Sequence, residues 1–145
     1  MKLKPSQILY ATAFIALLLS VGLIVYAATP RQIERLTEFY VLGPGGKAKD
    51  YPTRLVLGES GTVVLGITNR EGSDTQYSIS IKLDNETISR IDNIRLSNDE
   101  SWKQNYTFTP TTVGNNTTLS FFLYMNDSVS PYKDLRLFVS VVRDK

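Results

Sequence analysis

The residue types that most often carry proton transfer and thiol chemistry are missing from this chain, which contains no His and no Cys. The usual nitrogen and sulfur ligands of zinc and copper are missing for the same reason. A Ser–Lys pair or two carboxylates remain chemically available, and two pairs of acidic residues are close in sequence: Asp84 with Glu86, and Asp99 with Glu100. Such neighbours are typical of turns, so we expect no catalytic residues, no cofactor and no enzyme activity.

Two short segments resemble binding motifs only in part. The segment 43–47, Gly-Pro-Gly-Gly-Lys, is glycine-rich like a phosphate loop, but it lacks the G-x-x-x-x-G-K-[ST] spacing and therefore indicates a turn. Asp92, Asn98, Asp99 and Glu100 offer oxygen ligands for calcium, but their spacing is not that of an EF-hand. The sequence therefore predicts no metal site.

Asparagine amides form the most frequent reactive motif. The acceptor sequence Asn-x-Ser/Thr occurs at Asn85, Asn105, Asn115, Asn116 and Asn126. With 8 Asn and 27 Ser plus Thr among 145 residues, chance gives roughly one or two such triplets. Four of the five lie in or beside expected turns, and Asn105 faces solvent on an expected strand. We expect glycosylation of at least one site; the alternative is that Asn, Ser and Thr cluster because all three favour turns.

An uncharged apolar stretch runs from Ile8 to Ala28 and precedes all the expected strands. Its 21 residues span roughly 31 Å as a helix, which matches the hydrocarbon core of a bilayer. Eleven Ile, Leu, Phe and Val residues contribute about −3 to −6 kcal/mol to insertion. The stretch is longer than the apolar region of a signal peptide, which favours a retained anchor, although cleavage after Val25-Tyr26-Ala27 is the alternative.

Small residues form a strip on one face of this predicted helix. Thr12, Ala16 and Ser20 recur every four residues, a spacing that allows a second helix to approach closely. Small residues are also common in membrane helices that have no such partner. The strip is therefore a candidate helix–helix contact.

The charge distribution weakly favours one orientation of the helix in the membrane and argues against nucleic acid as a partner. Lys2 and Lys4 lie before the helix, so we expect a cytoplasmic N-terminus and a domain outside the cell. From Arg31 onward 14 Lys plus Arg balance 14 Asp plus Glu. A neutral domain without a basic cluster argues against nucleic acid as a ligand.

Short strands dominate the rest of the chain. Tyr77, Ile79, Ile81 and Leu83 alternate with polar residues, as in a half-buried strand. Similar alternation occurs in 62–69, 102–108, 119–125 and 135–141, whereas 88–96 is weaker and could form two pieces around Asp92-Asn93. Seven or eight strands without intervening helices predict a mainly β fold, an immunoglobulin-like antiparallel β-sandwich preceded by one N-terminal transmembrane α-helix.

The predicted organisation has four parts: a short basic segment at 1–7, a transmembrane helix at 8–28, a connector at 29–37 and an extracytoplasmic β-sandwich at 38–145. Without an inter-sheet disulfide, Trp102, Tyr106 and Phe121 are the expected core anchors. If Phe121 and Leu137 point inward, then Phe122, Tyr124 and Phe138 point outward, and pairing of the last two strands would bring these rings together. This group is the candidate partner surface, unless another segment or lipid covers it or the register is shifted by one residue.

Several blocks of sequence resemble a known family. They are Thr37 to Ala48, Tyr51-Pro52-Thr53, Leu57 to Gly61, Ile67 to Glu71, and Pro131-Tyr132 to Val142. Together they are similar to the extracytoplasmic module of domain-of-unknown-function family 1616, whose members are mostly archaeal membrane proteins. The resemblance implies an exported, membrane-attached domain and carries over no catalytic residues. Longer members have several membrane helices before the module, and this chain departs from them.

These observations predict a single-pass, membrane-anchored β-sandwich protein of the cell envelope that acts as a non-catalytic binding or structural module. Its expected partners are the lipid bilayer and another envelope or membrane protein, including a second copy of the chain. The alternative is an accessory subunit of a multi-protein membrane complex that docks through its transmembrane helix.

Overall fold

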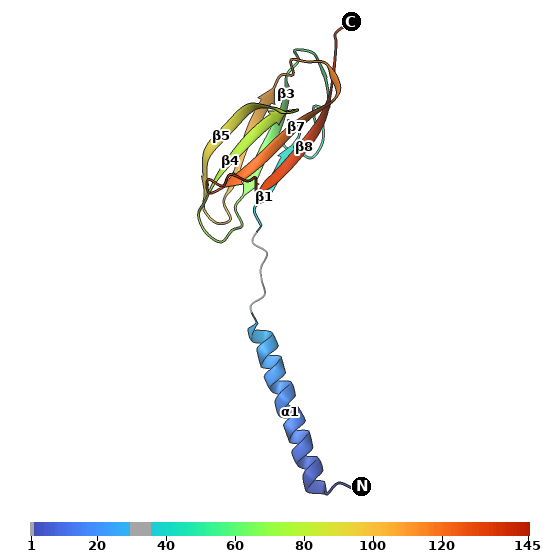
Figure 1. Cartoon of the computed structure of the whole chain (residues 1–145), viewed down its shortest axis with the longest axis vertical. Coiled ribbons are helices and arrows are strands. Elements are labelled where there is room, and N and C mark those ends of the chain that lie inside the picture. The colour runs from blue at the N-terminus through green and yellow to red at the C-terminus, as the bar shows by residue number, and fades with distance from the viewer. Residues whose placement is uncertain (1, 30–35) are drawn as a thin grey trace. The chain divides into compact units, whose positions relative to one another are not determined.

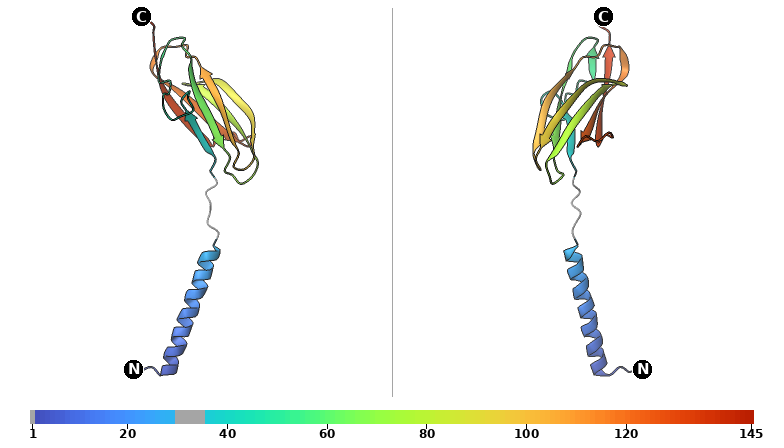
Figure 2. Two further views of the ribbon diagram at one scale, coloured as in Figure 1. Left: turned by 180° about the vertical axis from the view of Figure 1, so that it is seen from behind. Right: turned by 60° about the vertical axis from the view of Figure 1, so that its left-hand side comes forward.

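The structure, a computed structural model, describes residues 2–29 and 36–145. These residues belong to two separate units, an N-terminal helix and a β-sandwich (Figures 1 and 2). Residues 30–35 of the predicted connector 29–37 lie outside the described residues.

Helix α1 (Pro5–Ala28) begins three residues before the apolar stretch. Pro5 occupies the first turn, where its missing N–H is not needed, and the Lys4 backbone N–H donates to Oε1 of Gln7 at 3.1 Å. At the other end, the backbone N–H and the hydroxyl of Thr29 both donate to the carbonyl of Val25. The helix has 24 residues, contains an 18-residue window with a mean hydropathy of 2.5 and has no buried side chain, so it is long and apolar enough to span a membrane.

The sandwich consists of eight strands. They are β1 (Glu38–Leu42), β2 (Arg54–Val56), β3 (Gly61–Thr68), β4 (Thr75–Leu83), β5 (Glu86–Leu96), β6 (Ser101–Phe108), β7 (Gly114–Met125) and β8 (Lys133–Val142). Three form one sheet in the order β1-β3-β6, and five form the other in the order β2-β8-β7-β4-β5. The predicted mainly β, immunoglobulin-like sandwich is confirmed. All strand pairs are antiparallel except the short β2, which runs parallel to β8 at the edge of the larger sheet.

The core lies between the two sheets and follows the alternation of the strands. Ile79 and Ile81 of β4 and Leu119, Phe121 and Leu123 of β7 are fully buried. Of the expected anchors, Phe121 is fully buried, whereas Trp102 and Tyr106 are half-buried and pack against the core from β6. The rings of Tyr106 and Phe121 meet edge to face, with centroids 6.3 Å apart.

Strand β3 is buried on both faces along almost its whole length. Val63, Leu65 and Ile67 point into the core, and Val64 and Gly66 are buried on the opposite face. Tyr40, opposite Gly66 in the ladder, lies across that position. A Cβ at Gly66 would lie 2.2 Å from the Tyr40 ring, so a larger residue there would have to displace that ring.

Strand β5 resolves the ambiguity at 88–96. It is one continuous strand rather than two pieces. A shift in register between the Tyr77–Ile94 and Ile79–Ile91 pairs marks a bulge within it. Asn93 in the bulge has a φ of 60°, a conformation that Asn tolerates better than most residues.

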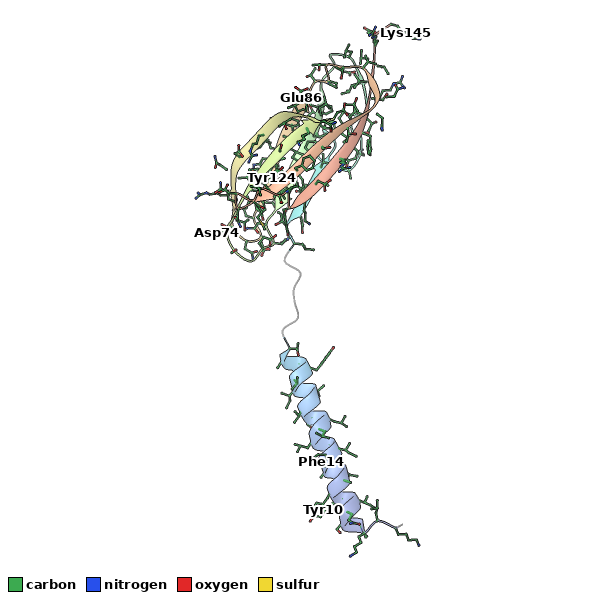
Figure 3. The ribbon with its side chains drawn as sticks, in the orientation of Figure 1. Tyr10, Phe14, Asp74, Glu86, Tyr124 and Lys145 are labelled. Carbon is green, nitrogen blue, oxygen red and sulfur yellow. The ribbon has the colours of Figure 1, made fainter. Side chains whose placement is uncertain are left out.

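The two ends of the sandwich carry different turns. The chain enters at Leu36 and Thr37, and this end, here called the proximal end, contains the β3–β4, β5–β6 and β7–β8 turns. The opposite, distal end contains the β4–β5 turn and the segment between β6 and β7. In Figure 3, Asp74 marks the proximal end and Glu86 the distal end.

Candidate functional site

The outer face of the five-stranded sheet holds the candidate partner surface. Alternation places Ile79, Ile81 and Phe121 in the core and therefore turns their strand neighbours outward. The three predicted rings, Phe122, Tyr124 and Phe138, lie on this outward face, so the register is not shifted by one residue. Figure 3 shows Tyr124 on the sheet face turned toward the viewer.

Two of the rings are half-buried beneath cationic side chains. The Lys82 ammonium lies 5.4 Å from the centroid of the Phe122 ring, and the Arg90 guanidinium lies 5.7 Å from that of Tyr124. Such contacts contribute about 0.5–1 kcal/mol at exposed sites. At these two positions the face therefore presents a cationic group that lies over an aromatic ring, and the ring itself is partly covered.

Phe138 stands apart from the other two rings. It pairs with Thr118, four residues along β7 from Phe122, a separation of roughly 13 Å along the strand. Arg136 and Ser120 lie between them on the same face. The expectation that all three rings come together is therefore wrong for Phe138, which lies apart from the other two and is 57% exposed.

Small polar residues form the floor between the long side chains. Ser80 of β4 and Ser120 of β7 face outward but are buried by their neighbours. Ser120 lies in one ladder row between Lys82 of β4 and Arg136 of β8. Cationic side chains thus flank a hydroxyl near the middle of the face.

Two acidic residues partly balance the charge of this face. Arg90 Nε lies 2.7 Å from Asp92 Oδ1, and Arg136 Nε lies 3.5 Å from Asp134 Oδ2. All four side chains are about half exposed, so these pairs add little to stability. Lys82 and Arg95 bring the face to a formal net charge of +2 for these six residues.

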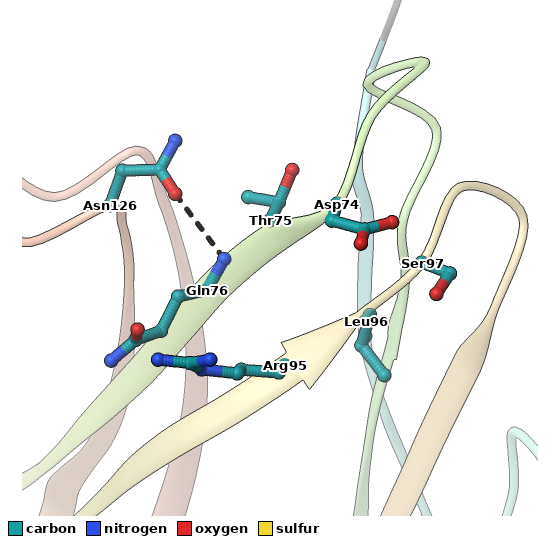
Figure 4. Close-up of a pocket in the computed structure, with 7 residues that line it drawn as sticks. All are labelled: Asp74, Thr75, Gln76, Arg95, Leu96, Ser97 and Asn126. Atoms are coloured by element: carbon teal, nitrogen blue, oxygen red, sulfur yellow. Dashed lines mark hydrogen bonds between the residues drawn. The ribbon is translucent and has the colours of Figure 1, made fainter.

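A shallow polar pocket lies where this face meets the proximal end (Figure 4). It has a volume of about 270 Å³, and Arg95, Gln76 and Asn126 line it together with Asp74. Oδ1 of Asn126 accepts a hydrogen bond from the Gln76 backbone N–H at 3.2 Å. The volume falls just below the range of typical small-molecule sites, and the lining is polar.

The acidic residues considered for chemistry serve the turns. Oε2 of Glu100 accepts the Ser97 backbone N–H, Oδ1 of Asp99 pairs with Arg70, and Oδ1 of Asp84 accepts the Thr118 backbone N–H. Of the oxygen ligands considered for calcium, Asn98, Asp99 and Glu100 lie in the β5–β6 turn, whereas Asp92 lies in the β5 bulge, away from that turn. Within residues 2–29 and 36–145, no three His, Cys, Asp or Glu side chains gather as metal ligands.

Sequence reasoning missed a buried hydrogen-bond network at the proximal end. The Thr37 hydroxyl donates to Glu71 Oε1 at 2.6 Å, so its oxygen is free to accept from the Tyr77 hydroxyl at 2.7 Å. The Thr37 backbone N–H and the Tyr132 hydroxyl donate to the same Glu71 oxygen. We call these four residues the proximal network.

Burial of the proximal network shifts the acidity of its phenols. Burial raises the pKa of Tyr77, although the hydrogen bond with Thr37 opposes this. Burial also raises the pKa of Tyr132, and its hydrogen bond to the Glu71 carboxylate adds to the shift. Both hydroxyls are therefore held as donors in the folded state.

Asn69 lies beside the proximal network and is fully buried. Its Nδ2 donates to the carbonyls of Ser73 and Leu96, and its Oδ1 accepts the Glu71 backbone N–H. In the sequence this residue opens an ordinary polar turn, so no local signal reveals its burial.

The helix strip does not depend on a partner for its hydrogen bonds. The Thr12 hydroxyl donates to the carbonyl of Leu9, and the Ser20 hydroxyl donates to that of Ala16. Apolar residues surround the strip on the rest of the helix surface. The strip remains a predicted contact.

Comparison with solved structures places the domain in the class of immunoglobulin-like sandwiches. The CARDB domain of the PF1109 protein from Pyrococcus furiosus, solved in complex with di-metal ions, superimposes with a TM-score of 0.58 at 12% identity, over 75% of this chain and 94% of that domain. A β-glucosidase from Listeria innocua in complex with glucose gives a TM-score of 0.51 at 17% identity over 73% of this chain, which spans 16% of the enzyme. At these identities the likeness concerns the fold.

The family follows from the sequence match. The family model described as "Domain of unknown function (DUF1616)" matches residues 30–140, and the chain belongs to this family. Among curated proteins, none matches the chain.

Proposed function

We propose that this protein is a single-pass, membrane-anchored binding module of the cell envelope without catalytic activity. The proposal depends on the presence, in one chain, of a 24-residue apolar helix and of a sandwich with aromatic rings and cationic side chains on the outer face of one sheet. The helix supplies the anchor, with the N-terminus in the cytoplasm and the sandwich outside. The outer face of the five-stranded sheet supplies the contact with another envelope protein or glycan.

Features of the face support this role. Exposed aromatic and arginine side chains are enriched at interface centres, and a ring such as Phe138 gains from leaving water. The buried Ser80 and Ser120 leave room between the cationic side chains of Lys82 and Arg136, where a partner side chain can contact the sheet.

The first experiment tests the anchor. Full-length protein should remain with membranes after alkaline carbonate washing, and Leu17→Arg with Leu18→Arg should release it, because each charge costs about 3 kcal/mol at the centre of a bilayer. Mass spectrometry of the mature N-terminus separates an anchor from a cleaved signal. A start at Ala28 would contradict the anchor.

The second experiment tests the face. Recovery of partners from native membranes by full-length protein should fall for Phe138→Ser and for Phe122→Ser with the fold unchanged. The matched control is Val129→Ser, which removes a 96% exposed side chain from the β7–β8 turn, outside the face. Equal recovery by all variants would exclude the face as the contact.

An accessory subunit that docks through its helix is the alternative. The strip of Thr12, Ala16 and Ser20 supports it, because its small side chains allow close helix contact. Crosslinking within the membrane should then fall sharply for Ala16→Ile and stay unchanged for Phe138→Ser. The opposite pattern would favour the sheet face.

A further inference from the structure

The five acceptor triplets differ in how well the folded domain offers them for modification. All five Asn side chains are exposed, so exposure alone does not rank them. A transferase that adds a glycan to Asn-x-Ser/Thr needs the amide nitrogen of Asn and the hydroxyl two residues later. The backbone must also be free enough of the sheet for an enzyme to bind it.

Three sites meet these conditions poorly. Asn105 lies within β6, where the triplet pairs with β3 along its whole length, and its Thr107 hydroxyl is bonded to Thr62 at 2.9 Å. The triplet of Asn115 ends at Thr117, which is buried. Asn126 lies in the exposed β7–β8 turn, but its backbone N–H donates to the Gln76 carbonyl and its amide oxygen accepts the Gln76 N–H. Both its backbone and its side chain are therefore held against β4 beside the pocket in Figure 4.

In the two remaining sites the Asn itself has no ladder partner, although the two residues after it are paired. Asn85 occupies the two-residue turn between β4 and β5 and is followed by Thr87, whose side chain is exposed. Asn116 lies in β7 at the interruption of the β7–β8 ladder between Gly114 and Thr117. Thr117 and Thr118 pair with Val139 and Phe138, and Thr118, which supplies the acceptor hydroxyl, is half-exposed.

These two sites are neighbours at the distal end. The Asp84 backbone N–H donates to the carbonyl of Thr118 at 2.7 Å, and Oδ1 of Asp84 accepts the Thr118 N–H at 2.9 Å. Asn85 follows Asp84 directly, and Asn116 precedes Thr118 by two residues. A single end of the sandwich thus presents both acceptors.

We propose that the distal end of the sandwich carries N-linked glycans at Asn85 and Asn116. The donor is a lipid-linked oligosaccharide with a phosphate or pyrophosphate leaving group. Nδ2 of Asn forms a bond to the anomeric carbon, the bond from that carbon to the phosphate oxygen breaks, the phosphate keeps the electron pair, and the amide loses one proton.

Glycans at these positions do not depend on the proposed partner surface, and of its three rings it is Phe138, paired with Thr118, that lies close to the Asn116 acceptor. Phe122 and Tyr124 lie in the half of β7 nearest the proximal end, whereas Asn116 lies at the opposite end of the strand. The glycans would therefore extend from the far end and leave this pair of rings accessible. Failure of partner binding would leave the modification untouched.

The test is mass spectrometry of the full-length protein isolated from its native membranes. We expect an intact mass above that of the polypeptide by two glycans, with glycopeptides that contain Asn85 and Asn116. An intact mass equal to that of the polypeptide would overturn the proposal. Glycans confined to Asn105, Asn115 or Asn126 would overturn the assignment to the distal turn.

Matched variants test the two sites without changing the Asn residues. Thr87→Ala and Thr118→Ala should each remove one glycan mass, whereas Thr87→Ser and Thr118→Ser should keep both. Thr107→Ala and Ser128→Ala, which destroy the triplets of Asn105 and Asn126, should leave the mass of the attached glycans unchanged. Two glycans retained in both Thr→Ala variants would contradict the proposal.

Discussion

The proximal and distal ends of the sandwich use similar residue types for different purposes. At the proximal end, Asn69, Thr37 and Glu71 are buried or half-buried and bonded to segments far away in sequence. At the distal end, Asn85 and Asn116 are exposed. The buried polar side chains of the proximal end therefore hold the fold together, whereas the amides of Asn85 and Asn116 remain available to solvent. The difference shows that Asn and Thr in turns cannot be assigned a role from composition alone.

The largest expected effect is at Asn69. Asn69→Ala leaves two carbonyls and one N–H without partners in a buried site, and we expect a loss of about 3 kcal/mol in the free energy of unfolding. Chemical denaturation of the full-length protein in detergent measures it. Asn98→Ala, in the exposed β5–β6 turn, is the control and should cost under about 1 kcal/mol. Equal losses would remove the distinction between buried and exposed turn residues.

Tyr77→Phe should have the next largest effect. The substitution removes a donor to the Thr37 hydroxyl within the core, and we expect a loss of about 1–2 kcal/mol. Tyr51→Phe offers a comparison outside the proximal network, because the Tyr51 hydroxyl donates to the Val41 carbonyl from a half-buried position. A smaller loss there, by the same denaturation method, would place the greater contribution in the proximal network.

Alkaline pH should weaken the proximal network as well. Because burial raises the pKa of Tyr77 and Tyr132, the unfolded chain loses these protons first as the pH rises. The stabilisation is complete below the ordinary tyrosine pKa of about 10 and is lost as the pH rises from there through the folded values. Denaturation midpoints at a series of pH values should fall above about pH 10, and less steeply for Tyr77→Phe. A flat profile for the native protein would contradict this.

The smallest effects belong to the distal acceptors. Asn85→Gln and Asn116→Gln keep an exposed amide, and we expect changes within about 0.5 kcal/mol for protein without glycans. Thermal unfolding of protein made in a host that lacks the transferase measures them. A clear loss would mean that these amides support the fold and would weaken the contrast between the ends.

Sequence patterns predicted most of the sandwich because alternation is a local property. The pattern from Tyr77 to Leu83 gave β4 and its inward face, and the rings on β7 and β8 were placed on the correct face. The offset of Phe138 was not predictable, because it depends on the β7–β8 register and hence on the turn between them. The parallel pairing of β2 depends on the return path of a long loop.

The proximal network was not predictable for a related reason. Glu71 and Tyr132 are 61 residues apart, and neither stands out in its own segment. The acceptor triplets were found by sequence, but their ranking needed the ladder and the burial of the hydroxyl two residues later. Local patterns thus identify strands and motifs, whereas partners across the fold require the structure.

The position of Thr37 has a mechanical consequence. If the helix anchors the protein as proposed, tension from it reaches the sandwich at β1, an edge strand that pairs only with β3. Just before that strand, Thr37 is fastened to Tyr77 of the opposite sheet and to Glu71. Tension would therefore load the hydrogen bonds of Thr37, and through them both sheets, before it loads the first β1–β3 pair.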